Sequence, residues 1–190
     1  NLAVQCFGGH GFISEWGAEQ NVREARISML YEGTTGIQAL DLLGRKVLGS
    51  GGELMKNFTK LVHKFCQANA DNAGMQVFVE PLTALNKELG ELTMHIGGKA
   101  MENPDEVGAA SVDYLMIAGY LTLGYFWALA AAKAQETLDA GTTEEAFYQA
   151  KITTAKFYFA RLLPRTKTHA ATIMSGLDNL MELDAEHFAL

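Results

Sequence analysis

Residues 114–132 of the chain, YLMIAGYLTLGYFWALAAA, carry no charged side chain and lie between Asp113 and Lys133. The stretch is long enough to span a bilayer, and a central buried helix of a bundle has the same composition. Two glycines, one threonine and three tyrosines interrupt its apolar character, and the neighbouring segments have apolar faces of their own. We therefore expect a buried central helix, with membrane contact as the alternative.

The sequence on both sides of this stretch also predicts helices. Apolar side chains recur at intervals of three and four residues in one amphipathic stripe, which consists of Leu54, Phe58, Leu61 and Phe65. No alternation with a period of two persists beyond a few residues, so we expect no strands. The predicted fold class is all-α, a helical bundle. The other helical runs are expected over residues 18–30, 35–48, 75–101, 105–139, 142–163 and from there to Gly176.

Several residues are expected to begin, bend or end these helices. Thr34 or Thr35 can act as an N-cap, because a hydroxyl there accepts a hydrogen bond from a free backbone N–H. Thr142 followed by Glu145 fits a capping box. Pro81 lies inside the helical run over residues 75–101, where a proline marks either a kink or an early start of the helix.

A glycine cluster divides the chain. Gly49-Ser50-Gly51-Gly52 ends one helical run and precedes the stripe of the next. We therefore predict a first domain over residues 1–48, a linker over 49–52 and a second, α-helical domain over 53–190.

Composition excludes several classes of protein. The chain has 190 residues, 48% of them hydrophobic and 19% charged, and a formal net charge of −7. An acidic chain lacks the basic stripe with which proteins neutralise nucleic-acid phosphates, so nucleic-acid binding is not expected. Cys6 and Cys66 lie far apart without CxxC spacing, which indicates free thiols in a reducing compartment.

The first residues, Asn1 to Gln5, include no initiator Met, no basic segment and no signal-peptide core. This pattern suggests that the sequence begins in the middle of a helix. We therefore expect a fragment of a longer protein.

Most candidate chemical groups have a structural explanation. The turn at residues 8–11 is not GxGxxG and follows no strand, so a Rossmann phosphate loop is not indicated. His63 and Cys66 are three residues apart, as metal ligands often are, but no further ligands cluster nearby. His95 follows Glu91 without an HExxH motif. No metal site is predicted, and surface or loop positions are expected for His10, His169 and His187.

Glu32 is different from these groups. It lies between Tyr31 and Gly33, at a break between two helical runs. A carboxylate beside an aromatic ring and a glycine can be desolvated, which raises its pKa and makes it a better base toward a weakly acidic C–H. From the residues alone, a glutamate at a helix boundary and a catalytic base both remain open.

Three ordered motifs resemble the C-terminal end of an acyl-CoA dehydrogenase. Residues 5–12, QCFGGHGF, are similar to the family pattern Q-x-x-G-G-x-G-[FY], and residues 23–27, REARI, to R-D-[AC]-[RK]-I. Residues 31–38, YEGTTGIQ, are similar to [YF]-E-G-T-[ST]-x-I-Q. The resemblance covers residues 1 to about 48. Residues 51–190 resemble, less specifically, the extra helical C-terminal domain of larger members, such as the methylthiopropanoyl-CoA and very-long-chain types.

The resemblance implies oxidation of an acyl-CoA to its trans-2-enoyl form. In the family a glutamate removes the Cα proton, the Cβ hydride passes to FAD, and electron-transferring flavoprotein takes the electrons. It implies that Glu32 is this base and that Gly33 lies against the thioester. The resemblance implies two sets of cofactor contacts. One turn contacts the FAD of a neighbouring subunit and consists of Gln5, Cys6, Phe7, Gly8 and Gly9. A second segment contacts FAD across the pocket and consists of Thr34, Thr35 and Gly36.

Two departures from the family pattern are small. Glu24 stands where the family commonly has Asp, and Gly36 stands where many members have Gln or Glu, which removes one side-chain contact to FAD. Because the family builds most of its pocket from residues upstream of these motifs, we expect the 190-residue chain alone to be catalytically inactive.

The resemblance also implies a homo-oligomer, located in the bacterial cytoplasm or, in a eukaryote, in the mitochondrial matrix. It leaves open the acyl chain and the choice between dimer and tetramer. A second interpretation is a non-catalytic helical interaction module, in which residues 51–190 provide dimer contacts or dock on a membrane surface.

Overall fold

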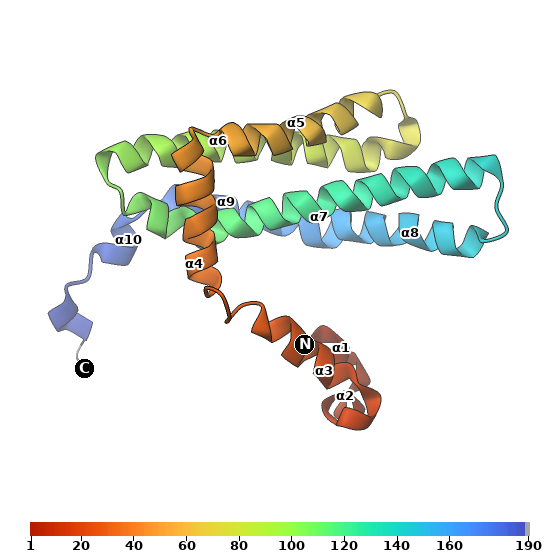
Figure 1. Cartoon of the computed structure of the whole chain (residues 1–190), viewed down its shortest axis with the longest axis horizontal. Helices are drawn as coiled ribbons and strands as arrows, with labels where there is room; N and C mark the ends of the chain where they lie inside the picture. Colours follow the sequence, from red (N-terminus) through yellow and green to blue (C-terminus); the bar gives the residue numbers. More distant parts are fainter. Residues whose placement is uncertain (189–190) are drawn as a thin grey trace. The chain divides into compact units, whose positions relative to one another are not determined.

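The structure is a computed structural model that describes residues 1–188. Its contacts divide the chain into two compact units, unit 1 from Asn1 to Ala39 and unit 2 from Leu40 onward. Within the described residues every regular element is a helix and none is a strand, which confirms the predicted all-α class (Figure 1). The last two residues of the predicted second domain, 189 and 190, lie outside this range.

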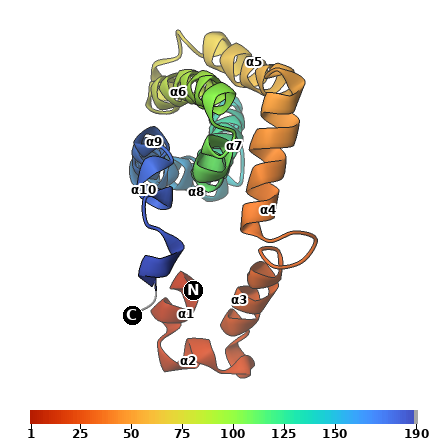
Figure 2. The ribbon, with the colours of Figure 1, turned by 90° about the vertical axis from the view of Figure 1, so that its left-hand side faces the viewer.

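Unit 2 is built around α7 (Glu106–Ala140), the helix that contains the uncharged stretch. It packs against α6, α8 and α9, which confirms its predicted central place in the bundle, although only one of its faces is buried (Figures 1 and 2). By length and composition α7 could also cross a membrane. Its buried residues recur every three or four positions and therefore form one face: Ala110, Ser111, Tyr114, Ile117, Leu121, Gly124, Ala128, Ala131 and Ala134.

One side of α7 is covered by the pair α5 (Glu53–Ala68) and α6 (Gln76–Glu102), which a short turn over residues 69–75 connects. The amphipathic stripe of α5 contributes Phe58 and Phe65, whose rings lie nearly perpendicular to that of Tyr125 at centroid distances of 6.3 and 5.7 Å. Pro81 lies five residues after the start of α6, which continues through it. The proline therefore lies inside α6, close to its start.

The other side is covered by α8 (Glu145–Phe157) and α9 (Thr166–Ser175). A π-helical turn over Tyr158–Leu162 and a 3-10 turn over Leu163–Arg165 connect them, and Pro164 lies in this 3-10 turn. Two short elements follow, α10 (Asp178–Met181) and a 3-10 turn over Ala185–Phe188.

The predicted capping box of α8 is wrong. The N-cap is Glu144, and the Thr142 hydroxyl accepts a hydrogen bond from the Glu144 N–H at 3.1 Å. Because the helix begins at Glu145, this glutamate occupies the first helical position and not the third, which a capping box requires.

Unit 1 consists of α1 (Leu2–Phe7), α2 (Gly9–Phe12), a 3-10 turn over Ser14–Trp16, α3 (Ala18–Ile27) and the start of α4 (Thr35–Leu40). The helix expected over residues 18–30 ends three residues early, where the Ser28 hydroxyl donates a hydrogen bond to the Ala25 carbonyl. Beyond Leu40 the backbone stays helical in a π form to Val47 and a 3-10 form to Ser50. Gly51 and Gly52 then adopt φ values of 61° and 80° at the predicted linker.

Tyr114 and Gly124 show how α7 meets its neighbours. The Thr93 hydroxyl donates its proton to the Leu89 carbonyl, so the fully buried Tyr114 hydroxyl donates to Thr93 Oγ1, at 2.7 Å. At Gly124 a Cβ atom would lie 3.3 Å from Leu82 Cδ2. A hydrogen bond therefore holds the large Tyr114 side chain in the first half of the buried face. Farther along the helix, the missing side chain of Gly124 permits close packing.

Replacing Gly124 by Leu should lower the free energy of unfolding by about 1–3 kcal/mol, because the added side chain overpacks the contact with Leu82 and Leu163. Gly108→Leu is the matched control on α7, since a Cβ there meets no atom within 4 Å. Urea unfolding followed by circular dichroism measures both variants. Equal stability of Gly124→Leu and the parent chain would contradict the packing described.

The stability of unit 2 should decrease at high pH. Burial raises the pKa of the Tyr114 and Tyr158 hydroxyls, whereas unfolded tyrosines lose their protons near pH 10. Above that pH the unfolded state binds fewer protons than the folded state, so the free energy of unfolding falls as pH rises. Urea titrations between pH 8 and 11 measure this slope. The Tyr114→Phe, Tyr158→Phe double variant should flatten it, and an unchanged slope would refute the assignment.

Candidate functional site

The turn that carries Glu32 is locally strained. Glu32 has φ = 54° and is the one non-glycine residue with positive φ in the part of the chain described. This left-handed conformation costs an ordinary residue roughly 1–2 kcal/mol. The Gln38 side chain offsets part of this cost, because its Nε2 donates a hydrogen bond to the Glu32 carbonyl at 2.9 Å. The backbone is thereby fixed while the Glu32 carboxylate stays exposed.

Gly33 is required by the same turn. Its φ is 108°, and a Cβ atom there would lie 3.2 Å from both Ile37 Cγ2 and Gln38 Nε2. The two residues after it, Thr34 and Thr35, lead directly into α4, and the Thr34 carbonyl accepts the first helical hydrogen bond, from the Gln38 N–H at 2.9 Å. The turn and the start of α4 therefore form one continuous structure.

The second predicted segment, residues 5–9, lies at the end of α1. Gly8 separates α1 from α2 with φ = 59° and ψ = −139°, a conformation suited to glycine. A Cβ at Gly8 or Gly9 would meet no atom within 4 Å, so the backbone is open to close approach. The side chains of Gln5, Cys6 and Phe7 are exposed.

Gly11, in the same glycine cluster, has a packing role. It is buried, and a Cβ there would come within 2.8 Å of Phe7 Cβ and Val4 Cα. The cluster thus combines an open turn with a tight contact between α1 and α2.

The structure does not bring the two segments together within unit 1. α1 packs along α3, since Asn1 and Ala3 share a groove with α3 residues from Ala18 to Arg26. α2, which follows the Gly8 turn, contacts α3 near its start, and the Glu32 turn follows the end of α3 (Figure 2). Ten residues of helix separate these ends by about 15 Å.

The remaining chemical groups do not form a site. His63 is exposed and Cys66 is buried, and burial raises the pKa of the Cys66 thiol. In the described range no three His, Cys, Asp or Glu side chains are placed to hold a metal ion. His169 was expected at a surface or loop position, but it lies half-buried in α9 with Nδ1 2.7 Å from Asp113 Oδ1.

One concave feature was not singled out by any motif. A groove of about 480 Å³ lies in unit 2, between residues 42–47, α5 and α7. Its α7 side includes Gly119 and Leu123, which belong to the uncharged stretch. The sequence signal for it was Gly119, one of the two glycines of that stretch, where a Cβ atom would meet no atom within 4 Å.

Comparison with known proteins identifies the family. Residues 58–184 match the family model described as "Acetyl-CoA dehydrogenase C-terminal like", and residues 1–48 match "Acyl-CoA dehydrogenase, C-terminal domain". The chain belongs to the acyl-CoA dehydrogenase family. It corresponds to the C-terminal portion of this family, as the motifs at residues 5–12 and 31–38 predict.

Three members of the family are similar to most of this chain. The 3-methylmercaptopropionyl-CoA dehydrogenase of Ruegeria pomeroyi is 36% identical over 182 residues, which are 95% of this chain and 31% of that protein. The broad-specificity linear acyl-CoA dehydrogenase FadE5 of Mycobacterium tuberculosis is 33% identical over 195 residues, covering 98% and 32%. A butyryl-CoA dehydrogenase of Syntrophomonas wolfei is 34% identical over 167 residues, covering 85% and 27%. The chain spans about a third of the length of these relatives.

The strain at the Glu32 turn can be tested with a matched pair of glycine variants. Gly33→Ala should speed amide hydrogen exchange over residues 35–40, because the alanine combines positive φ with contacts at 3.2 Å. Gly36→Ala should slow it, since a Cβ at Gly36 meets no atom within 4 Å and alanine favours a helix by about 1 kcal/mol. Exchange followed by mass spectrometry measures both. The same direction of change in both variants would contradict this description of the turn.

Proposed function

We propose that the chain is the C-terminal part of an FAD-dependent acyl-CoA dehydrogenase, which oxidises an acyl-CoA to trans-2-enoyl-CoA with Glu32 as the base. The observation that carries the proposal is the YEGTT turn, in which an exposed carboxylate is held on a fixed backbone beside a glycine. The names of the relatives, all acyl-CoA dehydrogenases, support the reaction class.

The proposed reaction assigns separate roles to Glu32 and Gly33. The Glu32 carboxylate takes the proton from Cα while the Cβ–H bond breaks, and the electron pair of the Cα–H bond forms the new double bond. Gly33 allows the thioester to lie close to the backbone, because no side chain intervenes. Bound FAD supplies the hydride acceptor for this chemistry.

Two features of the predicted cofactor residues support the proposed flavin contacts. Gly8 and Gly9 present open backbone beside the exposed side chains of Gln5, Cys6 and Phe7. The second segment follows the other end of α3 and consists of Thr34, Thr35 and Gly36. The Thr34 side chain is exposed. Following the family resemblance, we propose a homo-oligomer in which each chain contacts its own flavin with one segment and that of a neighbour with the other.

The proposal extends to the partner and the compartment. Electron-transferring flavoprotein would reoxidise the reduced flavin, in the bacterial cytoplasm or the mitochondrial matrix.

We further propose that the 190-residue chain alone is inactive. Unit 1 supports this, because within this chain it leaves many large apolar side chains exposed, among them Leu2, Phe12, Trp16, Ile27, Leu30, Tyr31 and Ile37.

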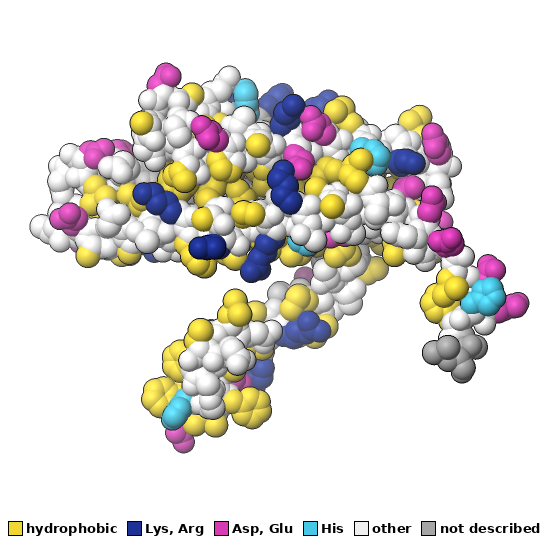
Figure 3. All heavy atoms as spheres, turned by 180° about the vertical axis from the view of Figure 1, so that it is seen from behind, with side chains coloured by type: hydrophobic (Ala, Val, Ile, Leu, Met, Phe, Trp, Pro, Cys, Tyr) yellow, Lys and Arg dark blue, Asp and Glu magenta, His cyan; other side chains and the backbone are white. Residues whose placement is uncertain are grey.

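An interaction module is the second candidate function, and the charge distribution of unit 2 favours it. Residues 146–177 contain five of the fifteen Lys and Arg residues and none of the twenty-two Asp and Glu residues. Figure 3 shows Lys and Arg side chains gathered over the α8–α9 side of unit 2, next to hydrophobic ones. Such a face suits an acidic partner surface. An interaction module needs no role for Glu32, so the following experiment distinguishes it from the dehydrogenase function.

The test uses the full-length enzyme that contains this chain. Glu32→Gln should retain FAD, visible as its absorbance band, and should lose the bleaching of that band by acyl-CoA, with turnover reduced by at least about 10²-fold. The amide has the shape of the carboxylate but cannot accept the Cα proton. Glu15→Gln, also exposed in unit 1, is the control and should bleach normally. Bleaching that persists in Glu32→Gln would place the base elsewhere.

A further inference from the structure

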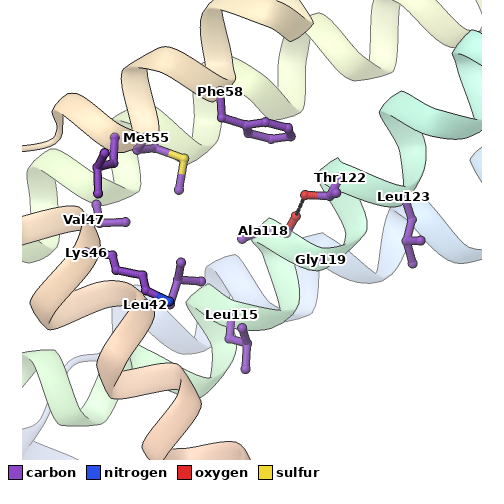
Figure 4. A pocket seen from close by; sticks show the side chains of 11 residues that line it. Leu42, Lys46, Val47, Met55, Phe58, Leu115, Ala118, Gly119, Thr122 and Leu123 are labelled. Carbon is purple, nitrogen blue, oxygen red and sulfur yellow. Dashed lines mark hydrogen bonds between the residues drawn. The ribbon is translucent and has the colours of Figure 1, made fainter. Parts of the chain in front are cut away.

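The groove in unit 2 has walls formed almost entirely by apolar side chains. Residues 42–47 contribute Leu42 and Val47, and α5 contributes Met55 and Phe58. Figure 4 shows these side chains pointing toward the space over Ala118 and Gly119 of α7. A groove with this lining favours an alkyl chain, because burial of apolar surface is worth about 25 cal/mol per Å².

The floor of the groove offers no free donor to a polar ligand. At Gly119 a Cβ atom would meet nothing within 4 Å, so the gap is open space above the helix backbone. The nearest hydroxyl, Thr122 Oγ1, already donates a hydrogen bond to the Ala118 carbonyl at 2.7 Å (Figure 4). From Leu115 to Leu123 the floor extends along α7 for about 12 Å.

Positive charge is present among the groove residues at Lys46. Its Nζ lies 2.9 Å from Asp41 Oδ2, and the same carboxylate also pairs with Arg45. These two cations lower the pKa of Asp41 to about 2, so it is a carboxylate at neutral pH. One carboxylate neutralises one of the two cations, and the side chain of Lys46 remains half exposed. The group therefore carries an excess positive charge beside an apolar groove.

We propose that this groove binds a medium-length fatty carboxylate, with its alkyl chain along α7 over Gly119 and its carboxylate at Lys46. The apolar groove of limited length matches the alkyl chain, and the net positive charge at Lys46 matches the carboxylate. This local positive charge occurs in a chain whose overall charge is −7. The site uses residues 42–123 and none of the residues assigned to Glu32 chemistry. Failure of one proposal therefore leaves the other intact.

The test is isothermal titration of the 190-residue chain with laurate, kept below its critical micelle concentration. Laurate should bind saturably with one site per chain. Gly119→Leu should weaken binding at least tenfold, because the side chain fills the groove. Lys46→Gln should weaken it several-fold and reduce its dependence on salt concentration. Binding that is absent, or unchanged by Gly119→Leu, would overturn the proposal.

Gly108→Leu is the matched control, since Gly108 is also exposed on α7 with open space around it but lies outside the groove. It should bind laurate as the parent chain does, and circular dichroism should show both leucine variants folded. Dodecanol, which lacks the carboxylate, should bind at least several-fold more weakly than laurate. If light scattering instead shows a dimer that Gly119→Leu dissociates and laurate does not, the occupant is a second copy and the proposal is wrong.

Discussion

Burial of one face of α7 is the constraint on which unit 2 depends. Nineteen consecutive uncharged residues cannot all face water, and the helix packs α6, α8 and α9 around itself. Small side chains dominate the second half of the buried face, at Gly124, Ala128, Ala131 and Ala134. They allow neighbouring helices to approach closely, so a larger side chain at Gly124 would force Leu82 and Leu163 apart.

The opposite face of α7 has the same apolar character but no complete cover. Met116, Leu123 and Phe126 remain exposed there, although each would suit a core. A helix that is apolar all round can be covered on one side by its own bundle and still present a second apolar surface. The groove over Gly119 is the concave part of that surface, and the charge group at Lys46 distinguishes it from the rest.

Unit 1 is organised by short-range geometry instead of a large core. Its turn at Glu32 is held by one hydrogen bond from Gln38, six residues later, and by the conformational freedom of Gly33. Because both partners lie within the same motif, the sequence pattern could point to Glu32 directly. The Gly8 turn is equally local, but its separation from Glu32 follows from the packing of α1 along α3, which no motif encodes.

The sequence by itself determined the all-α class, the approximate limits of α6 and α7 and the family, because periodicity, glycine turns and the ordered motifs are local properties. It misjudged the N-cap of α8 by two residues, since Glu144 and not Thr142 precedes the helix, and the end of α3 by three residues. Only the tertiary structure decided which face of α7 is buried, that the two predicted cofactor segments lie at opposite ends of α3, and that Lys46 lies beside a groove. These features depend on contacts between residues far apart in the chain, and a uniformly apolar stretch such as residues 114–132 does not specify its neighbours.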